Sequence, residues 1–306
     1  MASNVRWWCA ALRNARGLRR VRMVGAGILL GSLAIGSLSA RPANAQTQAT
    51  LTSSTKSTRQ EAIKSIPLDK LDDDYKAKIT SVVTQAGIFR RLPVQVIDCD
   101  PDLYLFLIRN PEVIVNIWEL MGISKVTMER TGPMSFETSD HAGSHGSVHV
   151  CYSNHDTHLI YAEGAYDGPL FTRPLRARCV LMLKSAYMHE TNNRDYVTCR
   201  MDAFIHIENM GVDLLAKTFQ PLVTKSADYN FSETAAFVSM VSKTAERNSR
   251  GMVRLAAKLS ATQPEVRQQF ADVATQVGER AAERIANTPA GEQATYRQPA
   301  ATVQRQ

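Results

Sequence analysis

A histidine-rich stretch, HAGSHGSVHVCYSNHDTH (His141–His158), holds five of the chain's seven histidines. Histidine can bind a metal ion or transfer protons near neutral pH, so this stretch is the first candidate for chemistry. If the chain turns at residues 153–157, the two flanking strands pair with His149 opposite Tyr161. His145, His149 and Glu163 then share one face of the hairpin, with ligand types that a metal could use.

The spacing within a strand argues against a metal site. Residues four apart in a strand are separated by about 13 Å, and a histidine places a metal only about 6 Å from its Cα atom. A helix would bring His145 and His149 together, but Gly143 and Gly146 oppose a helix. We therefore expect no metal and no cofactor. The histidines, including His155 and His158 at or beside the turn, are predicted to lie on a solvated strand face and turn.

The segment AGSHG (Ala142–Gly146) resembles a variant nucleophile elbow around Ser144. That motif needs a buried strand before the serine and a helix after it. Here a polar segment precedes Ser144 and a strand-like segment follows. The sequence consequently assigns no catalytic residue, and an enzyme is less well supported than a binding protein.

The first 45 residues have the layout of a secretory signal peptide. They hold seven arginines and no acidic residue; six arginines come before the apolar run Met23–Ala40, and Ala43-Asn44-Ala45 after it is a typical cleavage site. The run is short and diluted by Gly and Ser, which disfavours a permanent membrane span. We expect cleavage after Ala45, export to the periplasm or the cell exterior, and no stable membrane span afterwards. The pair Arg19-Arg20 leaves twin-arginine export open beside the general route.

The mature chain is electrically balanced. Removing the seven arginines of the leader from the total of 36 Lys and Arg leaves 29 basic residues against 29 acidic ones. A neutral chain lacks the basic excess of nucleic-acid binders, so no nucleic-acid partner is expected. Residues 46–64 are predicted to be a flexible linker, 65–260 one domain with an N-terminal helix, 261–287 a C-terminal helix, and 288–306 a disordered tail.

Helices and strands are predicted in a definite order. A helix spans about 72–86, a β-rich segment spans 92–100, and two short helices with a proline in the first turn follow up to Gly122. From 125 to 208 the periodicity changes to two and predicts six strands, the last pair joined at 191–194. In the last strand Val197–Ile207, apolar and polar residues alternate, so one face should be buried and one wet. Helices follow, with breaks expected at Pro221 and 228–230, and the last helix begins at Pro264. The fold class is α+β.

This order resembles that of START-like or polyketide-cyclase-like domains of the helix-grip superfamily, over about residues 92–248. The capped pair DPDLYLFLIRNPEVIVNIWELMG resembles that superfamily's helix pair, in which an "NPE" start leads to a tryptophan, here Trp118. The resemblance implies a curved antiparallel sheet of about seven strands around a C-terminal helical segment, with an apolar cavity between them. The helix at 72–86 and the helix after Pro264 are additions to that pattern.

The four cysteines after the leader allow two disulfides, since the count is even in an exported chain. A turn near Asn193 puts Cys199 opposite about Tyr187, which leaves Cys179 about 26 Å away and out of bonding range. In the implied arrangement the first and last strands are neighbours, so Cys99–Cys199 is the only candidate pair. Buried free thiols are the favoured state for all four.

Three functions follow from these observations. The leading hypothesis is an exported binding module for a lipid or another hydrophobic small molecule. The alternatives are a structural or interaction protein with a solid core, and a cavity-based enzyme of unknown reaction. The helix at 264–287 could pair with a second copy, although its short apolar seam favours docking on its own domain. The residues expected to line the cavity are Trp118, Val148, Val150, Ile160, Leu181, Leu183, Met201, Phe219 and Leu222.

Overall fold

The computed structural model describes residues 54–168, 173–191, 193–208 and 220–287. The predicted leader and its cleavage site, the first part of the predicted linker, Phe219 and the predicted tail lie outside these residues. None of the helices in the described residues combines the length and the apolar character needed to cross a bilayer.

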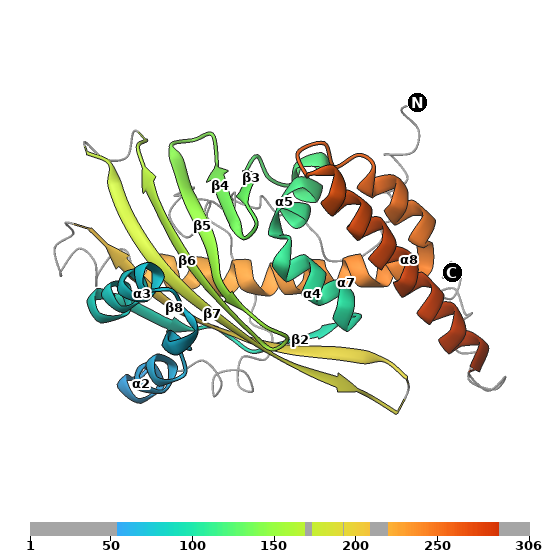
Figure 1. Ribbon diagram of the computed structural model, residues 1–306, viewed down its shortest axis with the longest axis horizontal. Helices are drawn as coiled ribbons and strands as arrows, with labels where there is room; N and C mark the ends of the chain where they lie inside the picture. The colour runs from blue at the N-terminus through green and yellow to red at the C-terminus, as the bar shows by residue number, and fades with distance from the viewer. Residues whose placement is uncertain (1–53, 169–172, 192, 209–219, 288–306) are drawn as a thin grey trace, which may run out of the picture.

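The described chain is an α+β fold, as predicted (Figure 1). Asp72 and Asp100 accept hydrogen bonds from the first backbone N–H groups of α3 and α4, which fixes where these helices begin. The helices are α2 (Lys56–Lys64), the 3-10 turn η1 (Leu68–Lys70), α3 (Asp73–Gln85), α4 (Pro101–Arg109), α5 (Pro111–Leu120), α7 (Gln220–Ala256) and α8 (Pro264–Asn287). The strands are β1 (Ile88–Arg91), β2 (Gln95–Asp98), β3 (Thr127–Gly132), β4 (Ser135–Ser139), β5 (Ser144–Ser153), β6 (Thr157–Tyr166), β7 (Leu175–His189) and β8 (Asp195–Ile207).

All the strands belong to one antiparallel sheet in the order β1-β8-β7-β6-β5-β4-β3, with β2 also paired to β8. The prediction of about seven strands becomes eight because β1 and β2 share one position beside β8. Pro93 lies between them and has no N–H to donate to a ladder, so the strand is interrupted there. The face of the sheet turned toward α7 is called the inner face below, and the opposite one the outer face.

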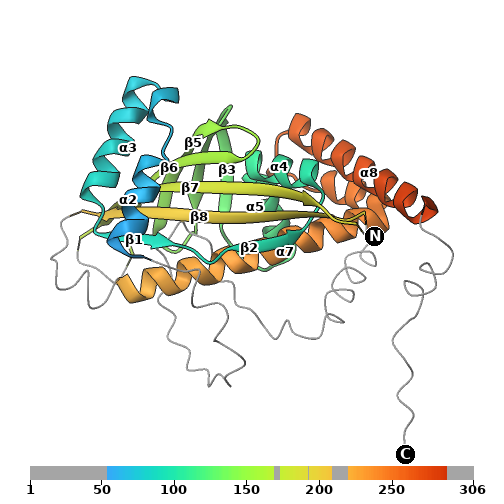
Figure 2. The ribbon, with the colours of Figure 1, turned by 90° about the horizontal axis from the view of Figure 1, so that it is seen from below.

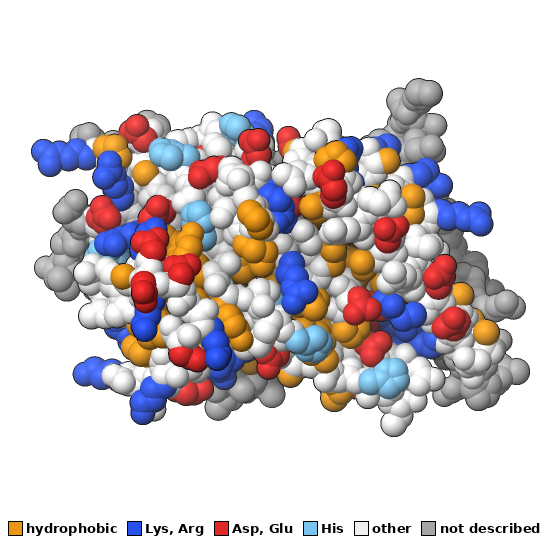
Figure 3. Space-filling model, in the orientation of Figure 1, with side chains coloured by type: hydrophobic (Ala, Val, Ile, Leu, Met, Phe, Trp, Pro, Cys, Tyr) orange, Lys and Arg blue, Asp and Glu red, His pale blue; other side chains and the backbone are white. Residues whose placement is uncertain are grey.

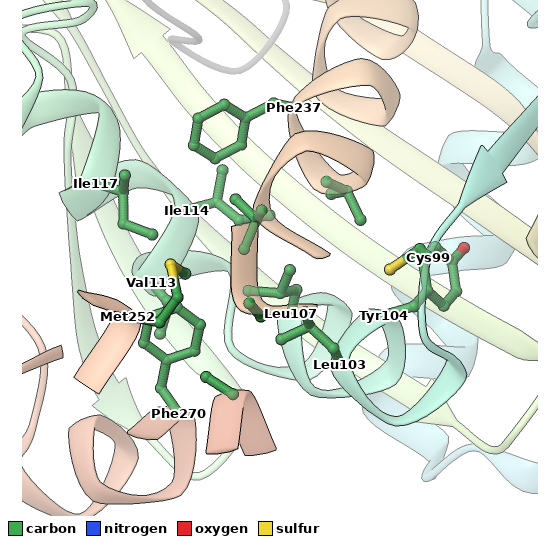
Figure 4. Close-up of a cluster of buried hydrophobic side chains, with 14 of the residues drawn as sticks. Cys99, Leu103, Tyr104, Leu107, Val113, Ile114, Ile117, Phe237, Met252 and Phe270 are labelled. Carbon is green, nitrogen blue, oxygen red and sulfur yellow. The ribbon is translucent and has the colours of Figure 1, made fainter. Parts of the chain in front are cut away.

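The inner face carries the largest core cluster. Helix α7 runs along this face, and α4, α5 and α8 close one end of it (Figures 1 and 2). Figure 4 shows side chains of α4, α5, α7 and α8 pointing toward one another in this cluster, with Phe237 of α7 above Ile114 and Phe270 of α8 beside Met252. Trp118 meets Phe237 edge to face, with 5.5 Å between ring centroids. This end of the fold is densely packed.

Part of the outer face is also buried, which corrects the expectation of one wet face. Residues 56–64, expected in a linker, form α2, and α2 and α3 lie on the outer face of β6, β7 and β8 (Figure 2). They cover Phe204, an apolar residue on the otherwise polar face of β8. Asp202, expected in water, is 1 % exposed and accepts two hydrogen bonds from Arg91 at 2.7 and 3.0 Å. The strand pattern could not reveal that a separate helix pair covers this face.

Helix α7 continues through both predicted breaks. Pro221 is helical within the described part of α7, which begins at Gln220, and residues 228–230 are helical as well. Asp228 does not cap a new helix, because its carboxylate pairs with Arg90 of β1. The one non-helical backbone conformation inside α7 is at Asn248, where the helix is kinked.

Helix α8 docks on its own domain, as the seam length favoured. Its apolar face, including Val266, Phe270 and Val277, belongs to the same core cluster as α4, α5 and α7. Arg280 donates to Asp100 at 2.9 and 2.8 Å, and Arg284 to Glu246 at 2.9 Å. The segment 261–287, predicted as a unit of its own, therefore shares one core with the domain, and this apolar face is already used within the chain.

Candidate functional site

The predicted cavity residues share a face but are packed. The pairing registers place the six predicted strand residues on the inner face, as the alternation indicated. Trp118, Val148 and Leu183 are buried within core clusters, and Val150, Ile160, Leu181 and Met201 pack against them. Phe219 and the side chain of Leu222 lie outside the described residues. Neither of the two hollows described below is lined by any of the seven described residues.

A small hollow does occur farther along the sheet, where small residues adjoin on neighbouring strands. Gly146, Gly164 and Ala177 lie side by side on β5, β6 and β7, and Ala162 and Cys179 follow in the next row. The hollow has a volume of about 30 Å³, which holds only one or two water molecules. A drug-sized ligand usually occupies a pocket of about 300–1,000 Å³.

The facing glycines Gly146 and Gly164 bring two backbones unusually close. A Cβ atom added to Gly146 would lie 2.5 Å from the carbonyl oxygen of Glu163 and 2.9 Å from the Cα atom of Gly164. No side chain fits there, so the sheet loses a layer of side-chain volume at this position. Gly146 and Gly164 face inward, and both also line a second hollow on the opposite face of the sheet.

A groove of about 390 Å³ occupies that part of the outer face. The registers align its rows: Glu137, Ser147, Glu163 and Arg178 lie across β4 to β7, and His145, Ala165 and Arg176 form the next row. Glu208 completes the lining at the end of β8. Figure 3 shows acidic, basic and histidine side chains interspersed on this face of the molecule. The groove therefore offers both charges over a floor of small residues, and its volume falls in the range of ligand sites.

Two of the charged groups face each other but have other partners. Glu163 and Arg178 are directly opposite on β6 and β7. Glu163 accepts a hydrogen bond from the Tyr161 hydroxyl at 2.7 Å, and burial next to this carboxylate raises the pKa of Tyr161. The buried Nε atom of Arg178 lies 3.4 Å from a carboxylate oxygen of Glu208, an ion pair whose geometry falls short of a hydrogen bond.

Part of this groove, on β5 and β6, was predicted from the sequence. The sequence predicted that His145 and Glu163 share a face and that His149 lies opposite Tyr161. The register of β5 with β6 confirms both predictions. The prediction missed Arg176 and Arg178. The signal was present, because these arginines are two apart on a strand that follows Glu163, but the hairpin of β6 with β7 was needed to align them.

The other histidines serve local contacts. His149 shares a hydrogen bond with Ser135 at 2.9 Å and lies against the ring of Tyr75, while exposed His155 packs on Tyr187. No group of three or more His, Cys, Asp or Glu side chains in the described residues has an arrangement that could hold a metal ion.

His158 corrects the solvated-turn expectation. Its side chain is fully buried on the inner face opposite Leu183, because residues of α4 cover this end of the hairpin. Nδ1 shares a hydrogen bond with Ser153 at 2.9 Å, and Nε2 has no partner among the described residues. Burial and the nearby Arg109 lower the pKa of His158 to about 4.

Ser144 does not sit in an elbow. It begins strand β5, its backbone N–H donates to Asp140 at 2.8 Å, and its buried hydroxyl has no hydrogen-bond partner among the described residues. A nucleophilic serine needs a base within hydrogen-bond reach. As expected, a strand and not a helix follows Ser144, which disfavours a nucleophile elbow.

The four described cysteines are free thiols. Cys199 pairs with Ser185 instead of Tyr187, since the β7–β8 turn is centred one residue earlier than predicted. On the other side of β8, Cys199 pairs with Gln95, which leaves Cys99 four residues farther along, about 13 Å away. The Cys99–Cys199 pair is therefore excluded by register, while burial raises the pKa of Cys179 to about 12.

Comparison with known proteins gives no match, either to a family model or to a curated protein.

Proposed function

We propose that this chain is an exported binding module whose site is the outer-face groove, and that its ligand is a small charged molecule. The observation that carries the proposal is the contrast in volume. The groove measures about 390 Å³ and is lined by three carboxylates, two arginines and a histidine, whereas the inner hollow measures about 30 Å³. Of these two hollows in the described residues, the groove is the one with the size of a ligand site.

The architecture supports a relation to helix-grip domains at the level of fold. In its favour are the strand order, with the first strand position beside the last strand, and the long helix along the inner face. The export proposal rests on the leader sequence alone. In such a fold the groove would lie on the side of the sheet opposite to the grip.

The experiment blocks the groove with a large side chain, and the matched control places the same side chain outside the groove. Ala165→Trp places an indole on the groove floor, and Ala186→Trp places one on the exposed outer face at the far end of β7. We expect ligand-observed NMR against a panel of amino acids, dicarboxylic acids and diamines to detect binding to the parent and to Ala186→Trp. Binding should be lost in Ala165→Trp. The proposal is contradicted if no compound of the panel binds the parent or Ala186→Trp. It is also contradicted if compounds bind the parent, Ala186→Trp and Ala165→Trp equally well.

A hydrophobic ligand is the second candidate, and the row of small inward-facing residues favours it. Protein interiors are normally filled, so adjoining glycines and alanines at inward positions leave room that a short apolar group could occupy. Native mass spectrometry after purification from the host, together with a fluorescent fatty-acid analogue, tests this. Ala177→Val should block such a ligand at little cost in stability. If the parent carries and binds nothing in either assay, an interaction protein with a solid core is the better description, and the core around Phe237 and Phe270 supports it.

A further inference from the structure

We propose that the groove recognises a small zwitterion of dipeptide size, with its carboxylate at Arg178 and its ammonium group at Glu163. This inference rests on the proposed function and names the ligand class of the same site. It starts from an unusual feature: opposite charges that face each other across two strands are each drawn to a different partner.

The basic side of the groove holds Arg176 and Arg178 on β7. Cross-strand neighbours of opposite charge usually pair directly, as their Cβ atoms are about 5 Å apart. Arg178 instead directs its Nε atom toward Glu208, just after β8, in an ion pair at 3.4 Å whose geometry falls short of a hydrogen bond. Arg176 is exposed two positions away on the same face of β7. A guanidinium group binds a carboxylate in a forked, two-bond geometry, so a ligand carboxylate fits this side.

The acidic side of the groove lies on the neighbouring strands. Glu163 on β6 is exposed, and the Tyr161 hydroxyl donates to only one of its two oxygens. Glu137 on β4 lies in the same row two strands away, with Ser147 between them. A cationic group placed above Ser147 would have a carboxylate on each side at about 5 Å in the sheet plane.

The separation of the two sides sets the size of the ligand. From the strand that carries Ser147 to the strand that carries Arg178 is two strand spacings, about 10 Å, and the charged side chains shorten the gap between them. An extended chain spans about 3.3–3.6 Å per residue, so the two termini of a dipeptide are about 7 Å apart. A single amino acid holds its charges too close together to meet both sides.

The test removes one charge at a time from ligand and protein. The probes are glycylglycine, N-acetylglycylglycine, which has no ammonium group, and glycylglycine amide, which has no carboxylate. Dissociation constants come from the shifts of backbone amide NMR signals in the groove. We expect each blocked probe to bind at least tenfold more weakly than glycylglycine. Arg178→Gln should abolish the effect of amidation, and Glu163→Gln the effect of acetylation, while Arg200→Gln, on the outer face outside the groove, should bind like the parent.

The possible results separate the two proposals. Equal binding of all three probes, or blocked-probe effects unchanged in both groove variants, overturns the zwitterion inference. No binding of glycylglycine overturns it as well, but the groove proposal stands if another charged molecule binds in a way that Ala165→Trp prevents. If no charged molecule binds in a way that Ala165→Trp prevents, both the zwitterion inference and the groove proposal are overturned.

Discussion

Replacement of His158 should change how stability depends on pH. The imidazole is fully buried, one nitrogen is held by Ser153, and the other has no partner among the described residues. Arg109 of α4 lies near enough to disfavour a positive charge, whereas Asp156 favours one more weakly. The folded protein therefore keeps this histidine neutral, with a pKa near 4, while the unfolded chain has an ordinary histidine with a pKa near 6.5.

The direction follows from proton binding. As the pH falls below about 6.5, the unfolded chain binds a proton that the folded protein refuses, so the free energy of unfolding decreases until the folded pKa near 4 is reached. The whole loss is about 3 kcal/mol at 1.36 kcal/mol per pKa unit. Between pH 7 and pH 5 the same relation gives about 2 kcal/mol.

The assay is urea unfolding of the parent and His158→Gln at pH 7 and pH 5. Glutamine cannot titrate, so the variant should lose about 2 kcal/mol less than the parent over this interval, whatever its stability at pH 7. Carboxylates with lowered pKa values, such as those of Glu61 and Asp98, titrate mostly below this interval and are present in both proteins. His155→Gln, an exposed histidine of the same hairpin, is the control and should behave like the parent. Identical losses in the parent and in His158→Gln would refute the reasoning.

Three further predictions concern packing and thiol access. Phe270→Ala should reduce the free energy of unfolding in urea by about 3–5 kcal/mol, since the ring is fully buried between α8 and α4; a loss under 1 kcal/mol would mean that α8 is not part of the core. Gly146→Ala should cost about 1–3 kcal/mol because its Cβ would meet backbone, whereas Gly132→Ala, with only ordinary contacts, should cost much less; equal thermal shifts would contradict the close approach of the strands. Cys151, which is partly exposed, should react with iodoacetamide before buried Cys179 does, as followed by peptide mass spectrometry; the reverse order would contradict the burial pattern.

The sequence predicted those features that local chemistry determines. Asp72 and Asp100 stand where helix caps are expected, and both cap helices. The turn after Ser153 fixed the register that brings His149 opposite Tyr161. By contrast, Pro221 and Asp228 have the residue types of a break but lie inside α7, since tertiary contacts such as the pairing of Asp228 with Arg90 outweigh a local preference.

The features that could not be predicted depend on which elements cover which face. His158 is polar and close to a turn, yet it is buried because it points to the inner face and α4 lies over it. Asp202 belongs to the polar side of β8, yet it is buried with Arg91 under α2. In both cases the strand pattern gives the correct face, and the position of a helix distant in sequence decides whether that face is wet.

The position of the covering helices also favours the groove as the proposed ligand site. Helices α2 and α3 cover the outer face of β6 to β8 at one end, and α4, α5, α7 and α8 fill the inner face. Among the described residues, the groove lies on the outer surface around Ala165, with charged residues of β4, β6 and β7 around it. In the folded chain Glu163 has the Tyr161 hydroxyl as a partner and Arg178 has the Glu208 carboxylate. A ligand that bridges Glu163 and Arg178 would add a second, charge-assisted partner to each.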